Sequence, residues 1–586
     1  MNVSQSAPPG RTSPLARILV RLALLGVLVG VALWFFSGGP GAPQIAPGTT
    51  LVLDVEGSYV EAPAAPLVSR LMGDDRRPFA ALLSQFAVAQ RDDRIDTVVL
   101  RMRGTRIGWG KAQELRGAIA DLRAEGKKTL AYLELASFSA SRDYYIASAA
   151  DEVVVPPGAL VPVVGLAAEY MFLGGLWEKL GIEVESERIG RYKSAVDSYT
   201  GVEMSESHRE MANSILDSVD AQFVEGIAEG RGLPVDAVRS AIDAGPVLGS
   251  ELEELGFIDR VAHLGDLEAM RKATVSGADY AAVDPAQVGF EPQASFALVY
   301  GAGTVVTGDG GRSPGGGPVF AADVVKKALS AAADDPEIDA IILRIDSPGG
   351  SSLASEVVWR AIQDVRERGK PVIASLSDVA ASGGYYAAVA ADRIVGDAGV
   401  LTGSIGVFVL RPVVGGLLEK LGVGVEALTR GERADFLLAS EALSPGARDR
   451  LRAIVVDTYD LFVQRVAEGR KLDPEAVDAL GQGRVWTGAQ AVERGLIDEV
   501  GGLRDAVTAG RRLLGLADDV DVELRVFPPP RGLADELTDL LRGSAGWAAL
   551  SDSLPLPEPL RRLEGWLLSL PPRTPLLIPP LLLDVR

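Results

Sequence analysis

Cysteine is absent from this chain of 586 residues. Its absence excludes a cysteine nucleophile, a disulfide and a zinc ion held by cysteine thiolates. Stability must therefore come from packed cores, and 47% of the residues are hydrophobic. A chain of this length and composition can build two or more such cores.

Histidine is almost as scarce, with only His208 and His263. Neither lies in an HExxH pattern, so a zinc protease of that class is excluded. A Ser-His-Asp triad would have to use one of these two residues. His208 lies in a charged stretch, which we interpret as a solvated helix face, and His263 follows near the end of the first half. We expect neither to be catalytic, and we expect no metal and no cofactor.

Positive charge is also in short supply, because 58 lysines and arginines face 79 acidic residues and the net charge is −21. A nucleic acid would be repelled by such a chain. We therefore expect no nucleic-acid partner.

One apolar run could span a bilayer. Residues 18–36 are apolar except for Arg21, and a spanning helix needs about 20 such residues. Arginines precede the run and no acid does, so the positive-inside rule places residues 1–17 in the cytoplasm. The alternative is a cleaved signal peptide, but the Gly- and Pro-rich stretch 37–50 is typical of a linker. We expect an uncleaved single-pass anchor in the inner membrane, with the remaining domains in the periplasm.

After the linker, strands alternate with amphipathic helices. Residues 51–55, 96–100 and 128–133 have the short apolar runs of buried strands, and a helix with inward Leu115, Ile119 and Leu122 separates the last two. This alternation predicts an α/β fold with largely parallel strands.

The pattern then repeats. Tyr385-Tyr386 matches Tyr144-Tyr145 at an offset of 241 positions, and residues 419–422 match 178–181 at the same offset. A match at constant offset over long stretches indicates a tandem duplication of one α/β domain. The predicted units are a first domain at 51–272, a connector at 273–295, a second domain at 296–527 and a tail at 528–586.

The second domain contains a candidate nucleophile. Ser382 follows a predicted strand at 371–376 and precedes Gly383-Gly384 and a predicted helix. Such a turn places the hydroxyl where unpaired N–H groups favour negative charge, although a simple helix N-cap has the same pattern. In the first domain, Ser141 lies opposite Ser382, but Arg142-Asp143 replace the two glycines.

A second pair of glycines, Gly349-Gly350, follows another predicted strand of the same domain. The first domain has no Gly-Gly at the matching residues 103–107. The N–H groups of Gly349 and Gly383 could form an oxyanion hole, the alternative being two ordinary glycine-rich turns.

A nucleophilic serine needs a general base, and neither histidine is well placed to act as one. Lysine is the next candidate, because a buried lysine can be neutral. Lys193 follows a predicted strand in the first domain, and its counterpart 241 positions later is Ala434. One half would thus supply the nucleophile and the other the base. The alternative is a solvated surface lysine.

Four motifs together resemble the long, double-domain form of the signal peptide peptidase A family of serine proteases. They are residues 346–350 (DSPGG), 381–385 (ASGGY), 402–406 (TGSIG) and 190–195 (GRYKSA). The resemblance covers about residues 51–527. It implies a ClpP/crotonase-like fold in each half, a membrane-anchored homotetramer facing the periplasm, and cleavage of leftover signal peptides.

The same resemblance implies roles for individual residues. Ser382 matches the nucleophile and Lys193 the general base. Gly349 and Gly383 match the oxyanion hole, with Gly350 beside them, and Ser404 matches a serine that orients the lysine. Whether Lys193 and Ser382 meet within one subunit or between subunits is left open by the sequence.

The tail at 528–586 departs from the family pattern. One apolar helical stripe runs from Leu560 to Leu570, and the apolar stretch 576–581 is broken by prolines, which makes it a poor membrane span. The bilayer surface and a neighbouring subunit are alternative partners for this segment.

Two other functions compete with the protease. A crotonase-type acyl-CoA enzyme would use the same fold, but carboxylates are its usual catalytic groups. A non-catalytic membrane scaffold would predict decay of the glycine turns in the second half, where they are intact.

Overall fold

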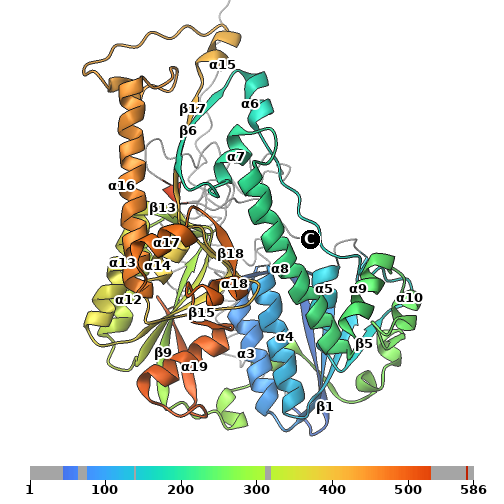
Figure 1. Cartoon of the computed structure of the whole chain (residues 1–586). Coiled ribbons are helices and arrows are strands. Elements are labelled where there is room, and N and C mark those ends of the chain that lie inside the picture. The colour runs from blue at the N-terminus through green and yellow to red at the C-terminus, as the bar shows by residue number, and fades with distance from the viewer. Residues whose placement is uncertain (1–43, 64–75, 137–139, 311–317, 530–575, 578–586) are drawn as a thin grey trace, which may run out of the picture.

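The computed structural model (Figure 1) describes residues 44–63, 76–136, 140–310, 318–529 and 576–577. The predicted anchor at 18–36 and most of the tail at 528–586 lie outside the described residues. Within the described ranges, no helix combines the length and the apolar character that crossing a bilayer requires.

The first half of the chain folds around a seven-stranded sheet in the order β2-β1-β3-β4-β5-β7, with β8 beside β1. All of its pairings are parallel, so crossover connections rather than tight hairpins must link the strands. The strands are β1 (Thr49–Val60), β2 (Arg77–Pro78), β3 (Ile95–Arg106), β4 (Lys128–Leu133), β5 (Glu152–Val155), β7 (Arg260–Val261) and β8 (Thr274–Ser276).

The second half folds around an eight-stranded sheet in the order β18-β16-β14-β12-β9-β20, with β15 and β19 extending from β14. Its pairings are parallel except that between β16 and β18. The strands are β9 (Ala294–Ala302), β12 (Ala340–Ser347), β14 (Val372–Ala381), β15 (Arg393–Gly396), β16 (Leu401–Gly403), β18 (Val485–Thr487), β19 (Glu499–Val500) and β20 (Val522–Phe527).

The two sheets share one strand order. The neighbours β1-β3-β4-β5-β7 of the first sheet correspond to β9-β12-β14-β15-β19 of the second. In addition, β8 pairs with β1 as β20 pairs with β9. The chain is therefore a two-domain α/β protein whose halves repeat one topology, as the constant offset in the sequence indicates.

The helices repeat in the same way, and each half has one helix of 26 residues, α8 or α16. Leu115, Ile119 and Leu122 of α4 are buried, as their spacing predicts. The first half has α3 (Phe79–Arg91), α4 (Trp109–Ala124), α5 (Ser141–Ala147), α6 (Gly174–Leu180), α7 (Ala195–Thr200), α8 (Glu206–Arg231), α9 (Val235–Ala244), α10 (Gly249–Glu254) and α11 (Gly277–Tyr280). The second half has α12 (Ala322–Asp334), α13 (Ser352–Glu367), α14 (Gly383–Ala388), α15 (Gly415–Lys420), α16 (Pro445–Arg470), α17 (Pro474–Leu480), α18 (Gly488–Glu493) and α19 (Leu503–Leu514).

A third sheet joins the two halves, in the order β11-β10-β13-β21-β17-β6. Strands β6 and β17 pair antiparallel over seven residues each and form an arm that projects from the body (Figure 1). This ladder brings the segment after β6, which contains Lys193, against the second domain. The strands are β6 (Glu183–Ile189), β10 (Thr304–Val306), β11 (Val319–Ala321), β13 (Gly350–Ser351), β17 (Val407–Val413) and β21 (Leu576–Leu577).

Most of the segment predicted as a connector, 273–295, packs on the first domain, whereas Glu291 N–H and Gln293 N–H donate to Asp521 of the second. Strand β8 lies within it and pairs with β1, and Tyr280 is buried in the first core. Strand β9 of the second sheet begins at Ala294. The division of the chain into the predicted units remains a prediction. Residues beyond 272, including β8 and Tyr280, contribute to the sheet and the core of the first domain.

Candidate active site

Ser382 lies on the turn between β14 and α14 and is fully buried. Its φ is +55° and its ψ is −116°, a backbone conformation that costs a residue with a side chain about 1–3 kcal/mol. Its N–H donates to the carbonyl of Gly403 at 2.8 Å, and its carbonyl accepts from Tyr386 N–H at 2.8 Å. Backbone strain held in place by its surroundings is typical of functional sites.

Lys193 lies on the loop between β6 and α7 and is fully buried. Its Nζ is 2.8 Å from Ser382 Oγ, although the two residues are 189 positions apart in sequence. The same nitrogen donates to the carbonyl and to the Oγ of Ser404, both at 2.9 Å. The structure therefore brings together Lys193, Ser382 and Ser404 within one chain.

Burial lowers the pKa of the Lys193 ammonium well below its ordinary value of 10.5. The three groups within hydrogen-bonding distance of Nζ are uncharged, so they do not offset the lost hydration as a carboxylate would. Burial therefore favours the neutral form of the amine, whose lone pair can accept a proton.

A loop of the second domain supports the Lys193 backbone. Tyr192 N–H donates to the carbonyl of Gln482 at 2.8 Å. Gly483 has a φ of +77°, and a Cβ there would lie 2.6 Å from the Lys193 Cβ. Ser404, whose φ is +53°, donates its N–H to the carbonyl of Arg484 at 2.7 Å. The sequence analysis missed this loop, because only the packing reveals why Gly483 has no side chain.

The two glycine turns touch each other. A Cβ at Gly383 would lie 3.1 Å from Gly350 N, and one at Gly384 would lie 2.9 Å from the carbonyl oxygen of Ser347. Gly349 has a φ of +102°, and its N–H donates to Ser347 Oγ at 3.1 Å. The predicted oxyanion residues thus lie side by side, next to Ser382.

A slot for an extended strand runs beside these glycines. Strand β21 fills it and pairs antiparallel with β13 on one side, Gly350 opposite Leu577, and with β17 on the other, Phe408 opposite Leu576. Leu576 and Leu577 of the tail therefore pair with strands of their own chain. The predicted helical stripe of the tail lies outside the described residues.

The matching turn of the first domain is closed. Ser141 Oγ donates to the carbonyl of Gly165 at 3.1 Å. The carboxylate of Asp143 accepts from the N–H and the Oγ of Thr105, at 3.0 and 2.7 Å. Arg142 lies over the ring of Trp109. Side chains therefore hold this turn of the first domain together, whereas in the second domain the backbones of the two glycine turns approach each other directly.

The interpretation of His208 as part of a solvated face was wrong, because the residue is fully buried. It shares the inward face of α8 with Met211, Ala212 and Ile215, a spacing of three, four and seven that the sequence already contained. His208 packs edge-on against Tyr170, with 5.0 Å between the ring centroids. His263 is exposed.

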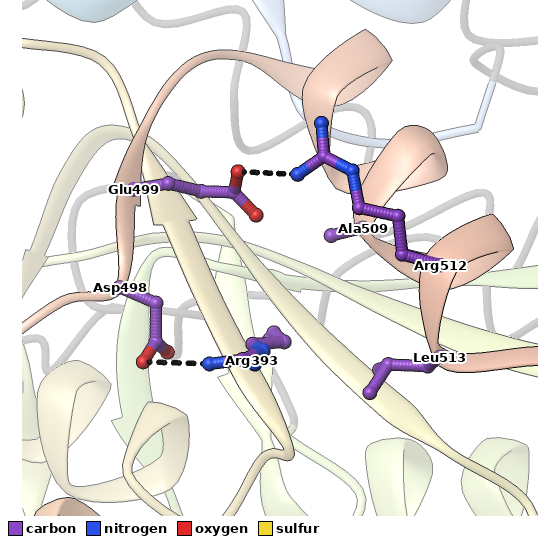
Figure 2. Close-up of a pocket in the computed structure, with 6 residues that line it drawn as sticks. All are labelled: Arg393, Asp498, Glu499, Ala509, Arg512 and Leu513. Carbon is purple, nitrogen blue, oxygen red and sulfur yellow. Dashed lines mark hydrogen bonds and ion pairs between the residues drawn. The ribbon is translucent and has the colours of Figure 1, made fainter. Parts of the chain in front are cut away.

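A hollow of about 260 Å³ opens elsewhere, between β15, β19 and α19. Figure 2 shows that its charged side chains pair with each other, Arg393 with Asp498 and Arg512 with Glu499. None of the predicted site residues lines it. Within the described part of the chain, no group of three or more histidine and acidic side chains is arranged to hold a metal ion.

Comparisons with known proteins follow the same division of the chain. The model of the family "Peptidase family S49" matches twice, at residues 121–276 and 364–517. "Serine protease SPPA, chloroplastic" of Arabidopsis thaliana is 34% identical over 475 residues, which cover 79% of this chain and 69% of that protein. "Protease 4" of Salmonella typhi is 30% identical over 526 residues, covering 84% and 82%. "Protease 4" of Haemophilus influenzae is 28% identical over 537 residues, covering 86% of each chain.

Proposed function

Because this chain belongs to peptidase family S49 and is a serine protease, we propose that it is a membrane-anchored endopeptidase that cleaves residual signal peptides. Ser382 is the proposed nucleophile and Lys193 the proposed general base. The observation that carries the proposal is the 2.8 Å separation of Lys193 Nζ and Ser382 Oγ in fully buried surroundings. The shared strand order of the two halves supports a ClpP/crotonase-like fold for each.

The proposed reaction begins with proton transfer. Neutral Lys193 accepts the hydroxyl proton of Ser382 while Oγ attacks the carbonyl carbon of the scissile bond. The resulting ammonium donates to the two oxygen atoms of Ser404, which stabilise it. It then gives its proton to the leaving amine as the C–N bond breaks, and an acyl-enzyme remains. A water molecule, deprotonated by Lys193, hydrolyses the ester and restores Ser382.

The tetrahedral intermediate carries negative charge on the former carbonyl oxygen. The N–H of Gly383 and the N–H of Gly349, with Gly350 beside it, are the proposed donors to this oxyanion. In the free protein, Gly349 N–H donates to Ser347 Oγ at 3.1 Å. When substrate binds, this N–H must exchange that hydrogen bond for one to the substrate oxygen.

The slot between β13 and β17 supports a peptide substrate. Its two edges bind an extended strand through backbone pairing, as the pairing of β21 illustrates. Recognition of this kind reads backbone rather than sequence, which suits apolar peptides of varied sequence such as cleaved signal peptides.

The proposed setting is the inner membrane, with residues 18–36 as a single-pass anchor, the N-terminus in the cytoplasm, the catalytic domains in the periplasm, and a homotetramer as the assembly. Extraction of the protein from membranes by detergent but not by high salt would support the anchor. Sedimentation in detergent measures the assembly, and a monomeric mass would contradict the tetramer.

The proposed dyad is tested with the full-length protein and a signal peptide that carries a fluorophore and a quencher. Ser382→Ala and Lys193→Ala should each lower kcat by about 10³-fold or more, because each removes a group that acts in the bond-making step. Far-UV circular dichroism checks that both variants fold. Cleavage near the wild-type rate by either folded variant would overturn the assignment.

The two competing functions are not favoured. The family matches are to proteases, which argues against an acyl-CoA enzyme. The intact glycine turns and the contact between Lys193 and Ser382 argue against a scaffold without catalytic activity.

A further inference from the structure

A group of buried and partly buried charges lies at the junction between the two domains, and the proposed chemistry does not use it. Its members come equally from both halves, and we call them the junction cluster. They are Glu61, Lys111 and Glu114 of the first domain and Arg344, Asp346 and Asp378 of the second.

Lys111 is 1% exposed and reaches across to the second domain. Its Nζ donates to Asp346 Oδ2 at 2.6 Å and to Asp378 Oδ2 at 2.7 Å. Although burial acts to lower it, these two carboxylates raise the pKa of Lys111 above its ordinary value. The carboxylates therefore favour the charged form of Lys111, whereas burial favours the neutral form of Lys193.

Arg344 makes the reverse connection and is fully buried. Its Nη2 donates to Glu61 Oε1 at 2.9 Å and also to Glu114. Each domain thus inserts one cation between two carboxylates of the other. Such reciprocal pairing is satisfied in only one relative placement of the domains.

Asp378 also fixes the beginning of helix α4. Its carboxylate accepts from the N–H of Gly108 at 2.8 Å and from the N–H of Lys111 at 2.9 Å, which satisfies donors that the first turn of a helix leaves unpaired. A Cβ at Gly108 would lie 2.3 Å from Asp378 Cγ, and one at Gly110 would lie 2.5 Å from the carbonyl oxygen of Ser377. The two domains therefore meet with no room for a side chain.

The two carboxylates bound by Lys111 lie just before the two turns of the candidate active site. Asp378 is four residues before Ser382, and Asp346 is three residues before Gly349. Asp346 Oδ1 also accepts from Val379 N–H at 3.2 Å, which ties β12 to β14. One ammonium group thus contacts both segments that must be aligned for nucleophilic attack.

We propose that Lys111 is a positioning residue that aligns the nucleophile turn with the oxyanion turn and seats the lysine-bearing domain against both. This inference rests on the proposed protease function. A buried ion pair gives little net stability, so the main effect of the cluster is on the placement of Ser382 and Gly349. The first domain, which has no dyad, has Arg103 at the position that matches Asp346, and Arg103 pairs with Glu56 near the surface.

The test compares Lys111→Met with Arg116→Met in the full-length protein. Arg116 is a cation on the same helix, but it contacts only the first domain. Its guanidinium donates to the carbonyls of Tyr145 and Gly226 and to Ser148 Oγ. For each variant, kcat and KM are measured with the quenched signal peptide, active sites are counted with a serine-reactive probe, and the melting temperature is recorded.

We expect Lys111→Met to lower kcat per titrated site by about 10- to 100-fold, the effect of a displacement of about 1 Å, with KM within about twofold of wild type. Arg116→Met should lower the melting temperature but keep kcat per site close to wild type. A kcat per site for Lys111→Met above half the wild-type value would overturn the proposal.

If Lys111→Met does not fold, Asp378→Asn decides the question. An asparagine retains an oxygen acceptor for the start of α4 but loses the charge that binds Lys111. A folded Asp378→Asn protein should show the same loss of kcat, and full activity would overturn the proposal. If Ser382→Ala is inactive while the cluster variants are normal, only the positioning role fails; if Ser382→Ala is active, the protease assignment itself fails.

Discussion

Lys193 must be neutral to act as a base, and a neutral buried lysine is costly to the fold. In the unfolded chain the amine is protonated up to its ordinary pKa of 10.5, whereas burial lowers the pKa in the folded protein. At a pH between the folded and the unfolded pKa, folding therefore releases a proton, and the free energy of unfolding rises with pH in that range. The proposed function and the stability of the fold are opposed at this residue.

This opposition predicts that Lys193→Met is more stable than wild type. Methionine has a similar length and no charge to desolvate, so the melting temperature at pH 7 should rise although catalysis is lost. The advantage should shrink as the pH rises toward 10, because the unfolded wild-type lysine then loses its proton as well. Differential scanning calorimetry at both pH values measures the effect. A melting temperature below that of wild type at pH 7 would show that Lys193 stabilises the fold.

Single residues could be predicted where the two halves differ. Ser382 and its glycines were predicted as a candidate site because Arg142-Asp143 replace the glycines in the first half. Lys193 was predicted as its base with Ala434 at the matching position of the second half. Lys111 offered no such signal. Its carboxylate partners are 235 and 267 positions away, and nothing local to Lys111 distinguishes it from a surface lysine. His208 was misinterpreted because the charges around it outweighed its apolar helical spacing.

At the scale of elements, the loop at residues 481–484 supports Lys193, the proposed base. Gly483→Ala would place a Cβ 2.6 Å from the Lys193 Cβ, so the lysine must shift. Gly495 has a similar φ, +69°, but a Cβ there meets nothing within 4 Å. Both substitutions introduce about 1 kcal/mol of backbone strain. We expect Gly483→Ala to lower kcat at least about tenfold and Gly495→Ala to leave it within about twofold, as measured by peptide cleavage. Equal activities would show that the loop does not position Lys193.

Strand β21 occupies the slot that a peptide substrate would need. A chain that ends at Pro575 lacks β21, whereas a chain that ends at Pro579 retains it. Since an internal strand competes with substrate for the same edges, we expect the shorter chain to show a lower KM and an unchanged kcat. The longer truncation serves as the control. A KM that is the same in both truncated proteins would indicate that β21 does not exclude substrate.

Elements were more predictable than their pairings. The strand at 128–133 was predicted with the bounds that β4 has, because buried parallel strands have a strong local pattern. The antiparallel ladder between β6 and β17 was not predicted, nor was the pairing of β21 with β13 and β17. Each of these pairings joins strand edges that are far apart in sequence, so no local pattern predicts them.

At the scale of the whole molecule, the proposed dyad is assembled from both halves of a single chain. Lys193 comes from the first half and Ser382 from the second, and the β6–β17 ladder and the junction cluster attach the halves independently. Disruption of either the ladder or the cluster should therefore reduce catalysis without unfolding the hydrophobic core of either domain.

This arrangement predicts that inactive variants do not complement each other. When Lys193→Ala and Ser382→Ala proteins are mixed, or expressed together, no chain contains both groups. We expect cleavage to stay at the background of the single variants, as measured with the quenched peptide. Recovery toward a quarter or more of wild-type activity would show that the lysine of one subunit serves the serine of another.

The central claim is that a buried, uncharged Lys193 activates Ser382, and the pH dependence of kcat/KM tests it most directly, because that ratio reports ionisations of the free enzyme. We predict one ionisation on the acid side, with a midpoint well below 10.5, and loss of activity as the pH falls through it, since an ammonium group cannot accept the serine proton. A midpoint close to 10.5, or a rate that stays constant down to pH 4, would contradict the account.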